Sequence, residues 1–285
     1  MASARLTCSF LGLKEGDSTL LCMPLQYIAG KMVVVRSLVA GLRLIPMAPS
    51  GHPLKDLKEA PTFAAMIPMQ VYNTLQVPEE KAILMGIKHL IIGGGAIDDA
   101  LANELKDFPN QVWSTYGMTE TLSHIALRRL NGTDASDWYT PFDNVRIRLS
   151  EEGTLIIHAP NVCAEELITN DIAEINEEGK FRILGRKDNT INSGGVKIQI
   201  EQVESRLRKH LDTPFLISAR QDAKFGEIVV LIYNKVENED DIRRVCESEL
   251  PTYWVPKAYI AVDELPMTGT GKPDRASARR IANSQ

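Results

Sequence analysis

A segment near the C-terminus places a lysine where it can act on phosphate. Residues 266–275 have the sequence Pro-Met-Thr-Gly-Thr-Gly-Lys-Pro-Asp-Arg, and the two glycines predict a flexible, exposed loop that carries Lys272. A lysine on such a loop can reach another surface and neutralise phosphate charge. The segment is not a Walker A loop, because the position five before Gly271 is Pro266 rather than glycine.

Two further segments have residue types that suit a reaction. Residues 114–120, Ser-Thr-Tyr-Gly-Met-Thr-Glu, put a hydroxyl and a carboxylate on a turn directly after a predicted strand. A strand-to-helix turn capped by Thr119 explains the same pattern equally well. Residues 184–197 are dense in glycine and charge, which suits a mobile connection that touches anions. For an isolated stretch of this kind, a solvated loop would be the favoured interpretation.

Short strands and helices must position residues 114–120. Apolar runs and their breakers alternate from residue 18 onward, and this alternation is typical of a layered α/β domain. The predicted strands are 18–23, 42–46, 88–92 and 112–115, and the predicted helices are 29–42, 62–75 and 98–106.

The pattern changes at about residue 141. Alternating runs at 144–150, 154–158, 171–176 and 180–184, with Glu-Glu-Gly turns, predict a β-rich subdomain over about 141–187. A loop is expected at 185–195. A compact segment follows, with helices at 200–211 and 240–250 and strands at 215–219, 228–234 and 259–262. We therefore expect a first domain over 1–188 and a small second domain over 189–285.

Composition limits the classes of protein that this chain can represent. Its 285 residues suffice for one large or two ordinary domains, and 44% are hydrophobic. A net charge of −5 with scattered Lys and Arg argues against a nucleic-acid-binding surface. Neither a signal peptide nor a run of ~18 apolar residues is found, so we expect a cytoplasmic protein. Without any CxxC pair, the cysteines are expected to be reduced, and they are Cys8, Cys22, Cys163 and Cys246.

Together and in this order, the three segments resemble the signature blocks of the adenylate-forming superfamily. That superfamily contains acyl-CoA synthetases, nonribosomal-peptide adenylation domains and luciferases. The resemblance runs from about Pro24 to Lys272. It implies a large domain with layered α/β and β-rich parts, followed by a small, mobile C-terminal α+β domain. It also implies an acid–thiol ligase that activates a carboxylic acid with ATP and Mg²⁺ and passes the acyl group to coenzyme A.

The resemblance implies roles at the nucleotide. Thr119 matches the hydroxyl that contacts the α-phosphate, Glu120 the carboxylate that holds Mg²⁺, and Lys272 the adenylation lysine. Attack of a carboxylate on the α-phosphate brings two anions together, so cations there would stabilise the reacting charge. The other matches are Gly94, Gly95 and Ala96 flanking the adenine, Tyr116 stacking on it with Gly117 beside it, and Asp171 and Arg186 at the ribose.

The same resemblance implies how thioester formation follows. Thiol attack on the acyl adenylate needs Lys272 out of the way and a path for pantetheine. Asp188 matches the hinge about which the small domain would rotate, which meets both needs. Gly194 and Gly195, which lack side chains, are candidates for the lining of the thiol tunnel.

Within the superfamily the chain resembles the o-succinylbenzoate–CoA ligases of menaquinone biosynthesis. Residues 24–30, 117–126 and 188–197 carry this likeness. Tyr27 occupies a position near the acyl site where many relatives have histidine. Ser123 and His124 are candidates for the border of the acyl pocket, and a hydrogen-bonded helix position is an equally good interpretation of His124. Asn170 departs from the usual Thr-Gly-Asp pattern.

One feature of full-length relatives is missing from this sequence. They carry a Ser/Thr/Gly-rich phosphate loop ending in lysine before the Pro24 segment, so we expect a shortened ligase. The alternatives are a non-catalytic fragment that binds a nucleotide or a partner, another acyl- or aryl-CoA synthetase, and a peptide-synthetase adenylation domain. Exposed apolar faces or strand edges would make a homo-oligomer a further hypothesis.

Overall fold

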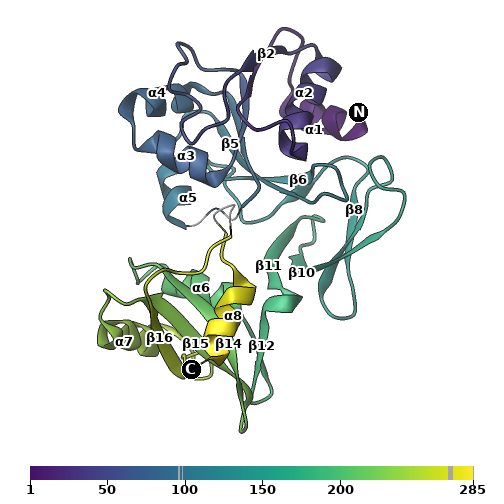
Figure 1. Cartoon of the computed structure of the whole chain (residues 1–285). Helices are drawn as coiled ribbons and strands as arrows, with labels where there is room; N and C mark the ends of the chain where they lie inside the picture. The colour runs from purple at the N-terminus through teal and green to yellow at the C-terminus, as the bar shows by residue number, and fades with distance from the viewer. Residues whose placement is uncertain (96, 98, 269–271, 285) are drawn as a thin grey trace. The chain divides into compact units, whose positions relative to one another are not determined.

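The first part of the chain forms a mostly parallel seven-stranded sheet (Figure 1). A computed structural model describes residues 1–95, 97, 99–268 and 272–284. The strand order is β2-β1-β3-β4-β5-β6-β7, parallel from β2 to β5 and antiparallel from β5 to β7. The strands are β1 (Ser18–Leu21), β2 (Arg43–Pro46), β3 (Phe63–Met66), β4 (His89–Ile92), β5 (Gln111–Gly117), β6 (His124–Arg129) and β7 (Thr140–Pro141).

Helices cover both faces of this sheet because its strands are apolar on both sides. Consecutive residues such as Leu90 and Ile91 belong to different apolar clusters. One cluster takes residues from α3, α4 and α5, and the other takes residues from α1 and α2. Strands buried on both faces are typical of parallel sheets. The helices are α1 (Ala2–Leu11), α2 (Ile28–Ala40), α3 (Pro68–Leu75), α4 (Pro78–Gly86) and α5 (Asp99–Leu105).

The helix predicted over 62–75 is wrong in its first half. Residues Phe63–Met66 form the buried strand β3, and α3 starts at Pro68. A proline fits the first turn of a helix, where its missing N–H is not needed, so Pro68 marks a beginning rather than an interruption. A short apolar run cannot be assigned to strand or helix by its periodicity alone. Helices α1 and α4 were not predicted.

The β-rich region has the predicted strands. Its four-stranded sheet has the order β11-β10-β9-β8, and Gly153 and Gly179 lie in the two predicted turns. The strands are β8 (Arg146–Leu149), β9 (Thr154–His158), β10 (Leu167–Ile175) and β11 (Phe181–Arg186).

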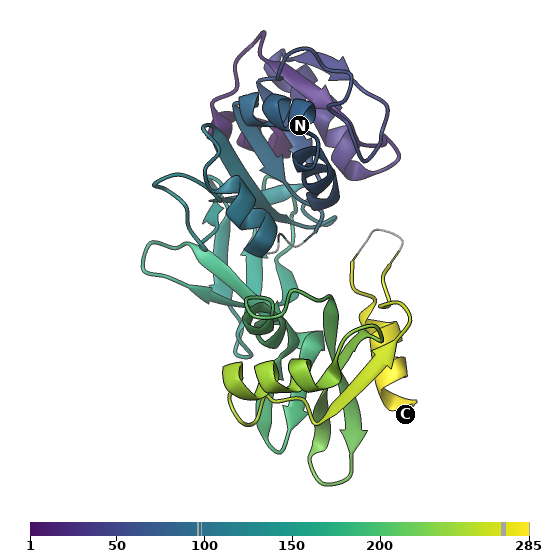
Figure 2. The same cartoon turned by 90° about the vertical axis from the view of Figure 1, so that its left-hand side faces the viewer.

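The C-terminal part has its own sheet, with helices on both faces (Figure 2). Its order is β13-β12-β15-β14, and β16 pairs with β15. Along β15, Leu231 packs with α6 and α7, whereas Val230 packs with α8. The elements are β12 (Thr190–Ser193), β13 (Val196–Gln199), α6 (Ile200–Leu207), β14 (Phe215–Asp222), β15 (Gly226–Asn234), α7 (Glu239–Glu249), β16 (Ala258–Val262) and α8 (Arg275–Asn283).

The loop predicted over 185–195 is wrong for most of its length. Residues Lys187–Asn189 form the short 3₁₀ helix η1, and β12 pairs with β13 as a hairpin across Gly194 and Gly195. Glycine density therefore marked a tight turn between strands rather than an irregular segment. The helix predicted over 200–211 ends earlier, at Leu207, and α8 was not predicted.

The chain divides into two compact units. The first unit is Met1–Thr169 with Glu174–Arg182, and the second is Asn170–Ala173 with Ile183–Gln285. The domain boundary at about residue 188 stays a prediction. Among the described residues, none of the helices has both the length and the apolar character needed to cross a bilayer. The cysteines are all free, and Cys163 is the only one that is not buried.

Candidate active site

A β-hairpin turn in the first unit presents Thr119 and Glu120. Gly117 ends β5 at a register shift, and a Cβ there would lie 2.4 Å from the backbone of both Ser123 and His124. Only glycine fits such a close approach. Because strand β6 follows this turn, the interpretation of Thr119 as a helix cap is wrong.

A buried threonine fixes the shape of the turn. The Thr121 hydroxyl accepts a hydrogen bond from the N–H of Met118 at 3.1 Å and lies 2.7 Å from the carbonyl oxygen of Ser123, to which it can donate. Thr119 and Glu120 are left exposed. One exposed carboxylate fits Mg²⁺ bound to a nucleotide, because this ion takes few protein ligands together with phosphate oxygens and water.

Tyr116 is held in an aromatic cluster within the first unit. Its ring centroid lies 5.0 Å from that of Phe181, edge to face, and 5.8 Å from that of Tyr139. Tyr139 and Phe181 are stacked at 5.4 Å. Such packing fixes the half-buried Tyr116 ring in orientation, as a stacking surface for a base requires.

A pocket of about 280 Å³ lies in the first unit, beside the turn. Its lining contains five of the predicted site residues: Gly94, Gly117, Thr119, Ser123 and His124. Tyr27 is 59% exposed and does not line the pocket, although its neighbours Ile28 and Ala29 do. Gly95, Tyr116 and Glu120 are also outside the lining. Ala96 lies outside the described residues.

The pocket wall also contains Arg36, which the sequence analysis missed. Arg36 lies on α2 and is 2% exposed. Its Nη2 donates to the Ser123 hydroxyl at 2.8 Å, and its Nε has no hydrogen-bond partner among the described residues. In the described part of the chain, no carboxylate forms an ion pair with Arg36. Burial lowers the pKa of Arg36 to about 10. A lone arginine within the apolar run 29–42 was the available signal.

His124 lies on strand β6, so its interpretation as a helix residue is wrong. It is buried beside Arg36 at the pocket. Its Nε2 lies 3.0 Å from the Thr7 hydroxyl, and its Nδ1 lies 3.3 Å from the Ser123 hydroxyl. Burial, together with the charge of Arg36, holds the pKa of His124 well below its ordinary value of 6.5. His124 is therefore a neutral hydrogen-bonding group at physiological pH.

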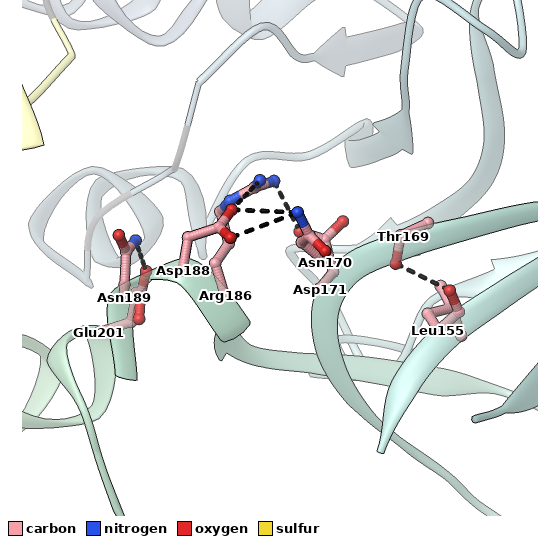
Figure 3. Close-up of polar contacts among 8 residues, drawn as sticks. All are labelled: Leu155, Thr169, Asn170, Asp171, Arg186, Asp188, Asn189 and Glu201. Carbon is pink, nitrogen blue, oxygen red and sulfur yellow. Dashed lines mark hydrogen bonds and ion pairs between the residues drawn. The ribbon is translucent and has the colours of Figure 1, made fainter. Parts of the chain in front are cut away.

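In the second unit the two predicted ribose residues contact each other (Figure 3). Arg186 donates to Asp171 at 3.2 Å and to Asp188 at 2.8 Å. The Asn170 amide also donates to both carboxylate oxygens of Asp188, at 3.2 and 3.3 Å. The hydrogen bond to Asp188 raises the pKa of Arg186 despite partial burial. The predicted hinge residue thus belongs to one polar network with the predicted ribose ligands.

The two predicted CoA glycines form the β12–β13 turn in the second unit. Gly194 and Gly195 both have positive φ, of 58° and 84°. The Gly194 N–H donates to the carbonyl oxygen of Phe225 at 2.8 Å, and a Cβ on Gly194 would lie 3.2 Å from the Phe225 ring. A side chain on Gly194 would press on Phe225, whereas Gly195 has open space and is restricted only by its positive φ.

Lys272 is exposed in the second unit, three residues before the start of α8. Met267 and Pro273 form a bridge, and the Thr268 N–H donates to the Lys272 carbonyl oxygen at 2.7 Å. Residues 269–271 lie outside the described part of the chain.

Known proteins match this arrangement along most of the chain. The sequence profile of the AMP-binding enzyme family matches residues 1–167, and that of the AMP-binding enzyme C-terminal domain matches residues 217–272. The chain belongs to the AMP-binding enzyme family.

Two similar proteins give a more specific comparison than the family does. The 2-succinylbenzoate–CoA ligase of Bacillus thuringiensis subsp. konkukian is 26% identical over 306 residues, which cover 95% of this chain and 63% of that protein. The chain thus spans 63% of the length of that curated relative. An acyl-CoA synthetase (AMP-forming)/AMP-acid ligase II-like protein from Dyadobacter fermentans is 33% identical, with a TM-score of 0.64, over 97% of this chain and 81% of its own.

A further solved structure confirms the predicted fold class. The o-succinylbenzoate–CoA synthetase of Bacillus subtilis, in complex with ATP and a magnesium ion, has a TM-score of 0.78 at 23% identity. The match covers 96% of this chain and 64% of that one. The expected α/β large domain and small C-terminal domain are therefore those of an adenylate-forming enzyme.

Proposed function

We propose that this chain carries the reaction centre of an AMP-forming acid–CoA ligase whose acid has a second carboxylate, such as 2-succinylbenzoate. In the first step a carboxylate oxygen bonds to the α-phosphorus of ATP and pyrophosphate leaves. In the second step the CoA sulfur bonds to the acyl carbon and AMP leaves. Membership of the AMP-binding enzyme family and the names of its relatives support this chemistry.

The residues of the turn and of the small unit suit the first step. The Thr119 hydroxyl is exposed and lines the pocket, where it can donate to a phosphate oxygen. Glu120 would hold Mg²⁺, which supplies positive charge at the phosphates when bound. Lys272 would add a second cation as the two anions meet. Preorganised donors of this kind are commonly worth about 3–4 kcal/mol each in the transition state.

Arg36 is the observation that carries the choice of acid. A buried cation without an acidic partner is unfavourable, because burial removes its hydration. A substrate carboxylate in the same pocket would supply the missing charge and could accept the free Nε–H. An acid whose only carboxylate reacts at the phosphate has nothing left to offer Arg36. A second carboxylate, as in 2-succinylbenzoate, fits both requirements.

Binding of non-hydrolysable acyl adenylates tests this choice. Calorimetric titration would compare an analogue that has the second carboxylate with a benzoyl analogue that lacks it. Arg36→Met is expected to weaken binding of the first roughly 10- to 100-fold, the loss typical of a charged hydrogen bond, and to leave binding of the second unchanged. Arg43→Met, which removes an exposed arginine from β2, serves as the matched control. If Arg36→Met binds both analogues with the same affinities as the unaltered chain, the assignment is ruled out.

A second candidate function is a fragment that binds nucleotide without turnover. The two candidates differ in chemistry rather than in binding. Acid-dependent release of pyrophosphate by the purified chain supports the ligase, whereas adenylate binding without release of pyrophosphate or formation of a thioester supports the fragment.

A further inference from the structure

A buried ion pair lies beneath the loop that carries Lys272. Glu204, on α6, has a side chain that is only 2% exposed. Arg275, the first residue of α8, donates from Nη1 to Oε1 at 2.6 Å and from Nη2 to Oε2 at 2.7 Å. This two-pronged arrangement is the strongest and most directional contact between arginine and a carboxylate.

The partners of this pair tie three elements of the second unit together. The N–H of Ile217 on β14 donates to Glu204 Oε1 at 3.0 Å, and Arg208 donates to Oε2 at 3.0 Å. Arg275 Nη1 also donates to the Ile217 carbonyl oxygen at 3.2 Å. Burial alone would lower the pKa of Arg275, but the hydrogen bonds and the charge of Glu204 outweigh it and the pKa is raised. The pair is thus satisfied on both sides.

Only two residues separate Arg275 from Lys272, and they pair back onto the other side of the loop. The Asp274 N–H donates to the Pro266 carbonyl oxygen at 2.9 Å. The Lys272 N–H donates to the Thr268 hydroxyl at 3.1 Å, opposite the bond from the Thr268 N–H to the Lys272 carbonyl. The backbone of Lys272 is therefore joined to the fixed Arg275 through two residues that are themselves held in place.

Helix α8 has other anchors that hold it on the sheet. Ala278 and Ala282 are fully buried in the apolar cluster with Val230 and Ile232. Asp274 caps the helix by accepting the N–H of Ser277 at 3.0 Å. The ion pair acts instead at the first residue of the helix, where the loop arrives. Its position suits control of the loop more than attachment of the helix.

We propose that Glu204, acting through Arg275, is a positioning residue for Lys272 in the adenylation step. The proposal rests on the proposed function, in which Lys272 stabilises charge at the α-phosphate. A lysine side chain is long and flexible, so the direction of its approach depends on where its backbone is held. A misplacement of about 1 Å can cost on the order of a hundredfold in rate.

The experiment replaces Glu204 by Gln, which keeps the size of the side chain but removes its charge. Hydrogen exchange of the amides of Thr268, Lys272 and Asp274 is expected to become at least about tenfold faster, because the hydrogen bonds that these amides donate lose their anchor at Arg275. The rate of acid-dependent pyrophosphate release is expected to fall roughly 100-fold with the KM for ATP unchanged. Thioester formation from supplied acyl adenylate should be retained, since Lys272 is not needed there.

Arg279→Gln is the matched control. Arg279 also lies on α8 and also forms an ion pair with a strand of the same sheet, through Glu227 on β15. That contact lies one helical turn beyond Arg275, so loop exchange and both half-reactions should be unchanged. Equal loss of both half-reactions in Glu204→Gln, or exchange of these amides no faster than in the unaltered chain, would overturn the proposal.

A double variant separates positioning from folding. If Glu204→Gln leaves Arg275 buried and unpaired and the second unit unfolds, Glu204→Gln/Arg275→Gln removes both charges and the folding penalty with them. Slow exchange in β14 and β15 would show that the sheet is intact, and fast exchange at Thr268, Lys272 and Asp274 would support the anchor. If the unaltered chain releases no pyrophosphate, the proposed first step fails, and the exchange result alone decides on the anchor.

Discussion

The proposed binding role of Arg36 comes with a cost in stability. Replacing this buried charge, which has no ion-pair partner among the described residues, by methionine is expected to increase the free energy of unfolding by about 1–4 kcal/mol while it weakens binding of the second carboxylate. The pKa of Arg36 is lowered to about 10, so the cost of the charge is present below pH 10 and declines as the pH rises through that value. Urea denaturation of both proteins at pH 8 measures the difference, and a less stable variant would contradict it.

Because it is buried, His124 should make the free energy of unfolding depend on pH. Its pKa is lowered in the folded chain, so below about pH 6.5 the unfolded chain takes up a proton that the folded chain does not. The free energy of unfolding should therefore fall as the pH drops, by up to about 1.4 kcal/mol per unit for this group. Urea denaturation at pH 7 and pH 5 should show a shallower dependence in His124→Gln. A slope in His124→Gln as steep as in the unaltered chain would contradict this account.

Lys272 should separate the two half-reactions. Lys272→Ala is expected to reduce acid-dependent pyrophosphate release by roughly 100- to 1000-fold, because one preorganised cation is lost at the reacting phosphate. Thioester formation from supplied acyl adenylate should be largely spared. The two rates are measured in parallel on the same preparation, and an equal loss in both would contradict a role confined to adenylation.

At the scale of the element, the β5–β6 turn depends on Gly117. A methyl group there meets the backbone of His124 at 2.4 Å, so Gly117→Ala is expected to cost about 1–3 kcal/mol through strain and to displace Thr119. Gly153→Ala is the comparison, because that turn has positive φ but open space. Thermal unfolding of both variants measures the loss. Loss of pyrophosphate release in Gly117→Ala alone would locate its effect at the site.

The sequence predicts elements well where a pattern is long. The strands of the β-rich region follow from alternating patterns, and helix α2 follows from a long apolar run without proline. Strand β3 did not, because four buried apolar residues before Pro68 fit strand and helix alike. Helix α1 was also missed, because its packing against the sheet rather than local propensity stabilises it.

The candidate site also contains residues that the local sequence indicates and one that it does not. Thr119, Asp171, Arg186 and Lys272 could be proposed as site residues because the short motifs around them resemble those of a known superfamily, and their roles stay predictions. Arg36 could not, because its meaning depends on burial and on the lack of a carboxylate among its described neighbours. Both properties arise only when α2 packs beside the β5–β6 turn. Three-dimensional context therefore supplied the residue on which the proposed choice of acid depends.

At the scale of the whole molecule, the central proposal is a hinge at Asp188. Asp188→Pro would fix φ at this residue and restrict the residue before it, so a change of conformation there should be blocked. One half-reaction should then be lost while the other persists. Asp188→Ala loses the same contacts with Arg186 and Asn170 but keeps backbone rotation, and it should retain both half-reactions. Identical behaviour of the two variants would contradict a hinge role.

The most direct measurement of the proposed chemistry supplies the activated acid. The purified chain would be mixed with 2-succinylbenzoyl adenylate and CoA, and the thioester and AMP would be quantified over a single turnover. A CoA ligase centre built on these residues predicts equal amounts of thioester and AMP, formed faster than in solution without protein. A thioester yield no higher than in the protein-free mixture, with no adenylate bound to the chain, would contradict the account.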